Sequence, residues 1–138
     1  MRPTIQVVAA ALINHRRQIM VARRAAHDTY AGQWEFPGGK IEPQETPLQA
    51  LFREIQEELG WTPSTAVSLG QLTHSYQPFD VELELFMVPW SGQPLVLVDH
   101  SEVRWLEVDQ LAGMDLAPAD LPFIPRIKAY VNQLPVDK

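Results

Sequence analysis

The chain has 138 residues, which is the usual size of one domain and is enough to bury a core, so we expect residues 1–138 to form a single domain. Its net charge of −6 argues against a nucleic-acid polymer as partner, although a small phosphorylated ligand needs only local positive charge and a metal ion. The absence of cysteine excludes disulfides and a thiol nucleophile. The apolar run Val7–Ile13 is far shorter than the ~20 residues that span a membrane, so we expect no membrane association and a cytoplasmic location.

The N-terminal quarter of the chain predicts a β-hairpin. Turn residues and apolar runs place strands at Thr4–Ile13 and Gln18–Arg24, followed by a loop over 25–33 and a short extended segment over 34–37. Arg23 is either solvated or bound to a phosphate, because arginine presents a forked set of donors. Phe36 and Trp34 are either core residues or flank a base, because flat rings stack on one another.

The stretch Gly38–Trp61 predicts a glycine-rich loop followed by a helix. Thr46 is a good N-cap, Pro47 suits the first helical position, and Gln49 completes a capping box. Gly60 suits the left-handed position after the last turn. The sequence therefore places the start and the end of this helix within one or two residues.

Three glutamates of this helix, Glu54, Glu57 and Glu58, are neighbours on its surface because they are three and four positions apart. Such a cluster is either a solvated acidic face or the ligand set of a hard cation, and carboxylate oxygens suit Mg²⁺ or Mn²⁺. No histidine lies between Gly38 and Trp61, so we do not expect zinc there.

The glycine-rich loop favours the cation interpretation of that cluster. Gly38-Gly39-Lys40 lets the backbone approach an anion and adds a positive charge beside it. Phosphate oxygens on one side and a carboxylate-bound metal on the other make a phosphoryl-transfer site.

The second half of the chain predicts strands, a polar cluster and a terminal helix. Strands are expected over Val67–Tyr76, Val81–Val88 and Val103–Val108, the last of them after the polar cluster Asp99–Glu102. Asp109 is expected to cap a short helix that ends near Gly113. Asp120 is a candidate cap for a helix over Leu121–Asn132.

The spacing from Gly39 through Glu45 to the run Arg53–Trp61 is similar to the Nudix box, a 23-position pattern of one glycine with fixed charged and apolar positions. Trp61 departs from it, because the family usually has an aliphatic residue there. Beyond the box, nearly the whole chain resembles the MutT-type branch. The resemblance implies an α/β/α sandwich around a mixed sheet, with the box as a loop–helix.

The resemblance also implies a Mg²⁺ site, in which Mn²⁺ is a substitute. The matching ligands are the carboxylates of Glu54, Glu57 and Glu58 and the backbone carbonyl of Gly38. Glu54 or Glu57 is also implied to orient or deprotonate water through the metal. A further acidic ligand comes from the loop before the penultimate strand, where Asp99 is nearest and Glu102 is the other candidate.

Other positions match the family's supporting and substrate-binding residues. Arg53 is implied to hold the carboxylates in place, with Glu45 fixing Arg53. The substrate-binding positions are Arg23, Phe36, Gly39, Lys40, Phe79 and Asp120. Lys40 and Arg23 are implied to contact phosphate, and Asp120 to recognise the base. Phe79 falls roughly where relatives have an arginine.

The resemblance implies hydrolysis of a nucleoside triphosphate to the monophosphate and pyrophosphate, with water attacking the β-phosphorus. We favour 8-oxo-dGTP as substrate, in nucleotide-pool sanitation. The segment Leu116–Pro122 resembles the (d)CTP pyrophosphohydrolases, so CTP, dCTP and 5-modified pyrimidines are the alternative. Hydrolysis of ADP-ribose or a dinucleoside polyphosphate, and a non-catalytic nucleotide-binding domain on the same fold, are further alternatives. We expect a monomer or a homodimer.

Overall fold

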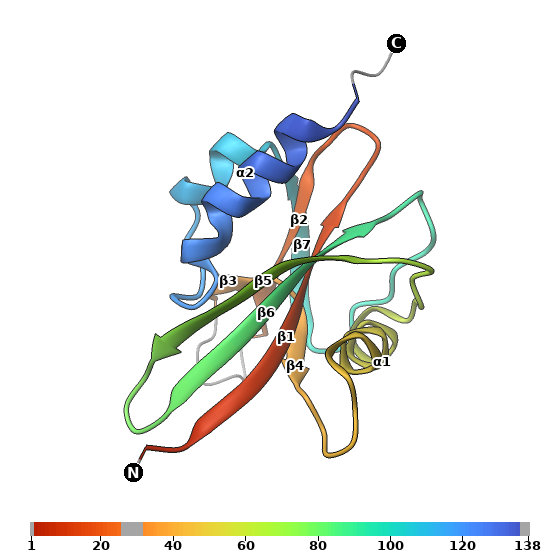
Figure 1. Ribbon diagram of the computed structural model, residues 1–138. Helices are drawn as coiled ribbons and strands as arrows, with labels where there is room; N and C mark the ends of the chain where they lie inside the picture. The colour runs from red at the N-terminus through yellow and green to blue at the C-terminus, as the bar shows by residue number, and fades with distance from the viewer. Residues whose placement is uncertain (1, 26–31, 136–138) are drawn as a thin grey trace.

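One mixed sheet and two helices make up most of the computed structural model, which describes residues 2–25 and 32–135 (Figure 1). Six residues of the loop expected over 25–33 lie outside this range. The strands are β1 (Thr4–Ile13), β2 (Ile19–Arg24), β3 (Trp34–Glu35), β4 (Gly38–Lys40), β5 (Val67–Ser75), β6 (Asp80–Pro89) and β7 (His100–Leu106). The helices are α1 (Pro47–Leu59), α2 (Ile124–Gln133) and the 3₁₀ turns η1 (Val108–Gly113) and η2 (Leu121–Phe123).

The central strand of the sheet is β1. It pairs in parallel with β6 along its whole length, from Thr4 opposite Asp80 to Ile13 opposite Pro89. It pairs antiparallel with β2 at the expected hairpin and with β4. Strands β3 and β7 extend the sheet beside β2, and β5 extends it beside β6. The sheet is therefore mixed, as predicted.

Strand β1 contributes to a hydrophobic core on each face of the sheet, because successive side chains of a strand point to opposite faces. Ala9, Ala11 and Ile13 belong to the core that includes Ile127 of α2. Val8, Ala10 and Leu12 belong to the core that includes Leu51, Ile55 and Leu59 of α1. Figure 1 shows the two helices on opposite sides of the sheet. This confirms the predicted α/β/α sandwich.

Helix α1 has the predicted ends. The Thr46 side chain accepts a hydrogen bond from the Gln49 backbone, and the Gln49 side chain accepts one from the Thr46 backbone, which is a complete capping box. Gly60 has a φ of 66°, in the left-handed region that glycine enters without a steric cost. Local sequence rules therefore fix where the helix places its acidic residues.

Four local predictions were wrong. Gly38–Lys40 is not a loop but strand β4, paired with Val7–Ala9 of β1. Strand β7 begins at His100, three residues early, because it pairs with the end of β2. Asp109 lies inside η1, whose cap is Glu107. Asp120 makes no side-chain capping bond, because its carboxylate accepts the backbone N–H of Phe36 instead.

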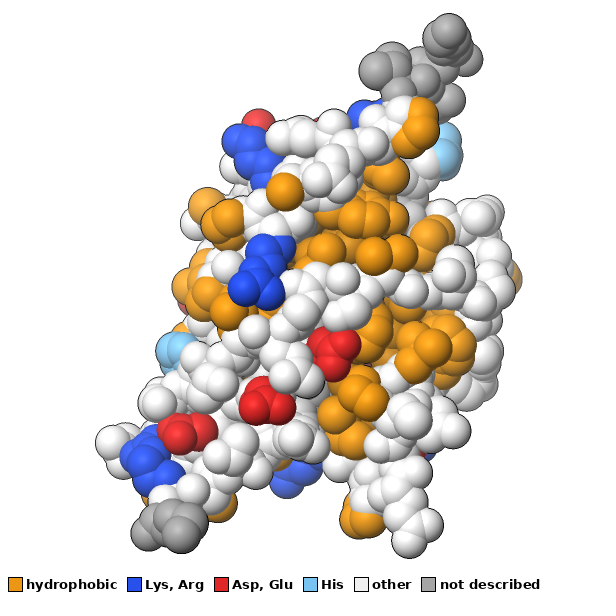
Figure 2. All heavy atoms as spheres, viewed as in Figure 1, with side chains coloured by type: hydrophobic (Ala, Val, Ile, Leu, Met, Phe, Trp, Pro, Cys, Tyr) orange, Lys and Arg blue, Asp and Glu red, His pale blue; other side chains and the backbone are white. Residues whose placement is uncertain are grey.

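Among the described residues, no helix is long and apolar enough to cross a bilayer. On the face shown in Figure 2, apolar side chains gather in the middle while the Lys and Arg side chains are scattered. This distribution differs from the continuous basic surface that binds nucleic acid through its phosphates.

Candidate active site

Arg53 joins the loop before α1, the acidic residues of the helix and strand β4. Its guanidinium binds both carboxylate oxygens of Glu45, at 2.7 and 2.9 Å. It also donates to Glu54 at 2.8 Å, to Glu57 at 3.3 Å and to the Lys40 carbonyl at 3.0 Å. The Arg53 side chain is the main reason that the pKa of Glu45 falls to about 2, so Glu45 stays ionised.

The two glycines of β4 allow the backbone to approach its neighbours closely. A Cβ on Gly39 would lie 2.5 Å from the carboxylate carbon of Glu54. A Cβ on Gly38 would overlap the backbone carbonyl of Val8. Both positions therefore need glycine because of space, and Gly39 in particular makes room for an acidic side chain of α1.

A polar cavity of about 280 Å³ lies beside α1. Its lining residues come from five segments and are Arg24, Glu35, Gly38, Glu54, Glu57, Glu58, Asp99 and His100. The structure thus brings together all five predicted ligands, which are Gly38, Glu54, Glu57, Glu58 and Asp99.

The chemistry of this cavity fits a divalent cation. Glu58 is 8% exposed, and no hydrogen bond from the described residues reaches its Oε2. Burial, followed by the nearby Glu54 carboxylate, raises the pKa of Glu58 to about 9. A cation would compensate the charge of the ionised carboxylate, which is why the residues present suit a bound metal.

Glu35 lies at the border between this cavity and a second one and contacts His100. Glu35 Oε1 accepts a hydrogen bond from Arg24 at 2.6 Å, and Glu35 Oε2 lies 2.9 Å from His100 Nε2. His100 Nε2 is also 4.0 Å from Glu58 Oε1. Arg24, Glu35 and Gly38 line both cavities, so the two are adjacent.

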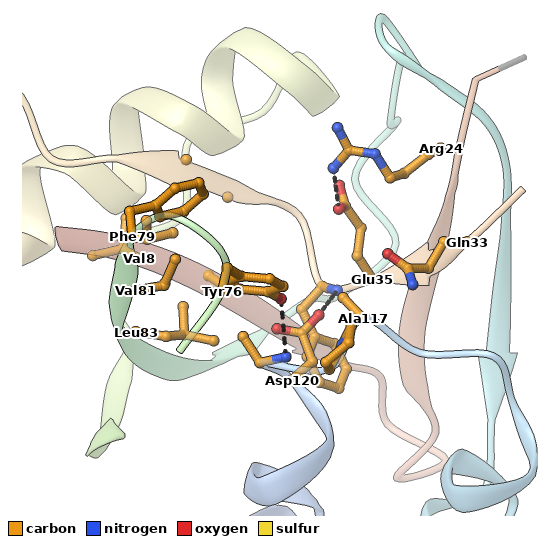
Figure 3. Close-up of a pocket in the computed structure, with 17 residues that line it drawn as sticks. Val8, Arg24, Gln33, Glu35, Tyr76, Phe79, Val81, Leu83, Ala117 and Asp120 are labelled. Carbon is orange, nitrogen blue, oxygen red and sulfur yellow. Dashed lines mark hydrogen bonds and ion pairs between the residues drawn. The ribbon is translucent and has the colours of Figure 1, made fainter. Parts of the chain in front are cut away.

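The second cavity is largely apolar and has a volume of about 380 Å³ (Figure 3). Phe36, Gly39, Phe79 and Asp120, all predicted to bind substrate, line it. The Phe79 ring packs against Tyr76 with 5.8 Å between the centroids. The Tyr76 hydroxyl accepts a hydrogen bond from the backbone of Ala119 at 3.3 Å, which ties the aromatic wall to the segment that ends at Asp120.

Asp120 is a buried acidic side chain that lines this apolar cavity. It is 5% exposed, and its Oδ2 accepts the Phe36 N–H at 3.1 Å. Burial raises the pKa of Asp120 to about 7, with the Phe36 N–H opposing and the negative charge of Glu35 reinforcing this shift. The carboxyl group is therefore able to act as a donor or as an acceptor near neutral pH.

Five predicted residues line neither cavity: Arg23, Lys40, Glu45, Arg53 and Glu102. Arg23 pairs with Glu102 at 3.3 Å, and Glu102 also lies 3.5 Å from Arg104. Lys40 is exposed and engages Arg53 through its carbonyl. Of the two candidates for the further acid, Asp99 lines the polar cavity and Glu102 does not.

Sequence reasoning missed Arg24, Glu35, His100 and Tyr76. Arg24 follows Arg23 in the strand, and alternation sends the two side chains to opposite faces, but the sequence did not show which face held the cavity. Only the acidic residues of the polar cluster Asp99–Glu102 were considered as ligands. The presence of His100 in the same cluster was the sequence feature that could have identified it as a site residue. Glu35 lies between Trp34 and Phe36, and only these two aromatic residues of the segment were considered as binding residues.

A sandwich of this kind, whose loop–helix holds a carboxylate cluster beside an apolar cavity, has the arrangement of a hydrolase of phosphorus anhydrides. The NUDIX domain family matches residues 3–127. The CTP pyrophosphohydrolase of Escherichia coli (strain K12) is 33% identical over 130 residues, which cover 94% of this chain and 96% of that protein. The 8-oxo-dGTP diphosphatase of the same strain is 34% identical over 125 residues, with 90% and 96% covered.

The fold comparison agrees with these sequence matches. The crystal structure of the MutT protein from Methanosarcina mazei Go1 superposes with a TM-score of 0.85 at 26% identity, covering 96% of this chain and 98% of the other. The chain therefore belongs to the NUDIX family, in its MutT-type branch.

Proposed function

We propose that this chain, as one cytoplasmic domain, hydrolyses nucleoside triphosphates to the monophosphate and pyrophosphate, with 8-oxo-dGTP as the favoured substrate. The observation that carries the proposal is the adjacency of two unlike cavities. The apolar one has the lining that a base needs, and the acidic one has the ligands that a phosphate-bound cation needs.

In this proposal Glu54, Glu57, Glu58 and the Gly38 carbonyl hold Mg²⁺, for which Mn²⁺ substitutes, and Asp99 adds a further oxygen. When bound, the ion neutralises phosphate charge and makes a water molecule more acidic. Arg53 keeps Glu54 and Glu57 oriented, and Glu45 keeps Arg53 in place. Glu54 or Glu57 takes the proton of the water that attacks the β-phosphorus.

The residues proposed to bind the substrate divide between the two cavities. Phe36 and Phe79 pack against the base, and Gly39 leaves room beside it. Asp120 reads the base through hydrogen bonds. The phosphate contacts of Lys40 and Arg23 stay predictions from the resemblance, and the position of Arg24 in both cavities makes it a further candidate for such a contact.

The alternative substrates are CTP, dCTP and 5-modified pyrimidine triphosphates. The buried Asp120 supports them, because an ionised carboxylate accepts a hydrogen bond from the exocyclic amino group of cytosine. It supports 8-oxoguanine in a similar way, since guanine offers ring and exocyclic N–H donors. Of the two Escherichia coli relatives, one is named a CTP pyrophosphohydrolase and the other an 8-oxo-dGTP diphosphatase.

The test is pyrophosphate release with Mg²⁺ across 8-oxo-dGTP, dGTP, CTP, dCTP, 5-methyl-dCTP and ADP-ribose, compared by kcat/KM. A preference for 8-oxo-dGTP supports the main proposal, and a preference for cytosine nucleotides supports the alternative. Nucleotide binding without turnover of any compound would overturn both.

Asp120→Ala separates base recognition from a merely structural role. We expect the ranking of nucleotides by kcat/KM to change, because the variant removes a buried carboxylate that lines the apolar cavity. An equal loss for every nucleotide would show that Asp120 supports the fold and does not read the base.

A further inference from the structure

We propose that Glu35, Glu58 and His100 form a second divalent-cation site, in which the His100 imidazole supplies a nitrogen ligand. The site takes a cation that accepts a nitrogen ligand, such as Zn²⁺ or Mn²⁺, in preference to Mg²⁺. It lies in the same polar cavity as the all-oxygen ligand set proposed above, shares Glu58 with it, and differs from it in Glu35 and His100. Its existence depends on these three side chains and not on the reaction that the enzyme performs.

The first argument is the spacing of the donor atoms. The three residues come from β3, α1 and β7, and each offers one ligand atom within 4.8 Å of the other two. Glu35 Oε2 is 2.9 Å from His100 Nε2, which in turn is 4.0 Å from Glu58 Oε1. An ion with bonds of about 2.1 Å separates its ligand atoms by roughly 3 to 4 Å. Small side-chain movements would therefore bring all three donor atoms within bonding distance of one ion.

The second argument is that the donors are held in place before any ion arrives. The His100 side chain is 2% exposed, and those of Glu35 and Glu58 are 16% and 11% exposed. Arg24 binds Glu35 Oε1, which leaves Oε2 directed at the imidazole. A site whose ligands are already ordered loses little side-chain entropy on binding.

The third argument is the presence of buried polar atoms without partners. Glu58 Oε2 and His100 Nδ1 are both buried, and neither has a hydrogen-bond partner among the described residues. A bound cation would satisfy Glu58 Oε2, which is the unpartnered oxygen of this set. The polar cavity of about 280 Å³ that both residues line gives an ion access.

The donor set decides which ion is preferred. Mg²⁺ favours oxygen ligands and keeps several waters, whereas an imidazole nitrogen suits zinc and other transition metals. A mixed set of two carboxylates and one imidazole therefore discriminates against Mg²⁺. The competing interpretation is that His100 only donates a hydrogen bond to Glu35 and never binds an ion.

Pulsed EPR of the full chain loaded with Mn²⁺ alone separates these two interpretations. We expect electron spin echo modulation from one imidazole nitrogen, and a change in its frequencies when the protein is made with ¹⁵N-histidine. The labelled wild-type protein gives this answer without any variant. Bound Mn²⁺ that shows no nitrogen modulation at any loading would overturn the proposal.

Variants then assign the nitrogen. His100→Gln should abolish the modulation and weaken Mn²⁺ binding by 10-fold or more, while Mg²⁺ binding changes less. His74→Gln is the matched control, because His74 lies on β5 against Tyr76 and lines neither cavity. Modulation that survives in His100→Gln and disappears in His74→Gln would place the ligand elsewhere.

Failure of this proposal is distinguishable from failure of the proposed function. Nucleotide turnover in Mg²⁺ without nitrogen modulation leaves the function intact and removes the His100 site. Nitrogen modulation without turnover of any nucleotide supports the His100 site and overturns the proposed function.

Discussion

At the scale of single residues, Arg53 controls the charge state of the site. It is the one cation on α1, and its side chain is 22% exposed with acidic groups from Glu45 to Glu57 around it. These carboxylates raise the pKa of Arg53, so it stays charged under all ordinary conditions. A permanently charged arginine holds the Glu54 and Glu57 carboxylates close together, which a metal site needs.

We expect Glu57→Gln to lower kcat by at least 100-fold, because it removes a proposed metal ligand and a candidate base. The Glu57 side chain is 58% exposed, so the free energy of unfolding should change by less than about 1 kcal/mol. Initial rates of pyrophosphate release and a urea titration measure the two effects.

Glu82→Gln is the matched control for that variant, since Glu82 is a partly exposed glutamate of β6 that lines neither the acidic nor the apolar cavity. It should keep wild-type kcat. Full activity in Glu57→Gln would remove Glu57 from the metal site.

Asp120 should make stability depend on pH. Its pKa is raised from 3.8 to about 7 in the folded protein, mainly by burial. Below pH 4 both states bind the proton, and between pH 4 and 7 the unfolded chain loses it first, so the stability falls as the pH rises. The loss is about 4 kcal/mol at most and levels off above pH 7.

Asp120→Asn tests this dependence, because asparagine keeps an oxygen for the Phe36 N–H and has no charge. Chemical unfolding at pH 4.5 and 7.5 in constant Mg²⁺ should show a smaller decline in the variant than in the wild type. Equal declines would mean that the carboxylate is solvated well enough to ionise in the folded state.

At the scale of secondary-structure elements, β4 and α1 act as one unit. Strand β4 pairs with β1, and Gly39 in it leaves the space that Glu54 of α1 fills. The Lys40 carbonyl binds Arg53, which connects the two elements a second time. The position of the acidic side chains therefore depends on the strand as much as on the helix.

Gly39→Ala should displace Glu54, because the new Cβ would lie 2.5 Å from its carboxylate carbon. We expect kcat/KM to fall at least 10-fold while circular dichroism shows a folded protein. Gly113→Ala is the control, since nothing lies within 4 Å of a Cβ there, and it should keep full activity. Equal activity of the two variants would contradict the close approach at Gly39.

Thr46→Ala removes the side-chain half of the α1 capping box. The free energy of unfolding should fall by about 1 kcal/mol, as measured by urea titration. Thr65→Ala, at an exposed threonine outside any helix or strand, should change it by much less. A capping loss no larger than that of Thr65→Ala would mean that packing alone defines the helix start.

Elements whose signals are local were predictable from the sequence. Helix α1 has its caps at its own ends, β1 is a long apolar run, and β6 alternates apolar and acidic residues in its first half. Strand β4 and the start of β7 were missed because they form through pairing with residues far along the chain. The same applies to the site: Glu54, Glu57 and Glu58 share one helix face, whereas Glu35 and His100 meet only in the folded sheet.

At the scale of the whole molecule, the two cores share one sheet. Val8, Ala10 and Leu12 pack toward α1, and the alternate residues of the same strand pack toward α2. Loss of either core would expose one face of β1. We therefore propose that residues 1–138 unfold as one cooperative domain.

Leu51→Ala and Ile127→Ala test this cooperativity from the two sides. Each removes a fully buried side chain and should cost about 2 to 5 kcal/mol. In both variants tryptophan fluorescence and far-UV circular dichroism should report one common midpoint in urea. Two separate midpoints in either variant would show that the cores unfold independently.

Much of the wall of the apolar cavity comes from segments that are separate from Gly38–Leu59. Tyr76 and Phe79 lie at the junction of β5 and β6, and Ala117 to Asp120 precede the last helix. After a gene duplication, substitutions in these two short segments would change which nucleotide is selected without altering the metal ligands. New specificities can thus arise in this fold by few steps, each of which leaves a working enzyme.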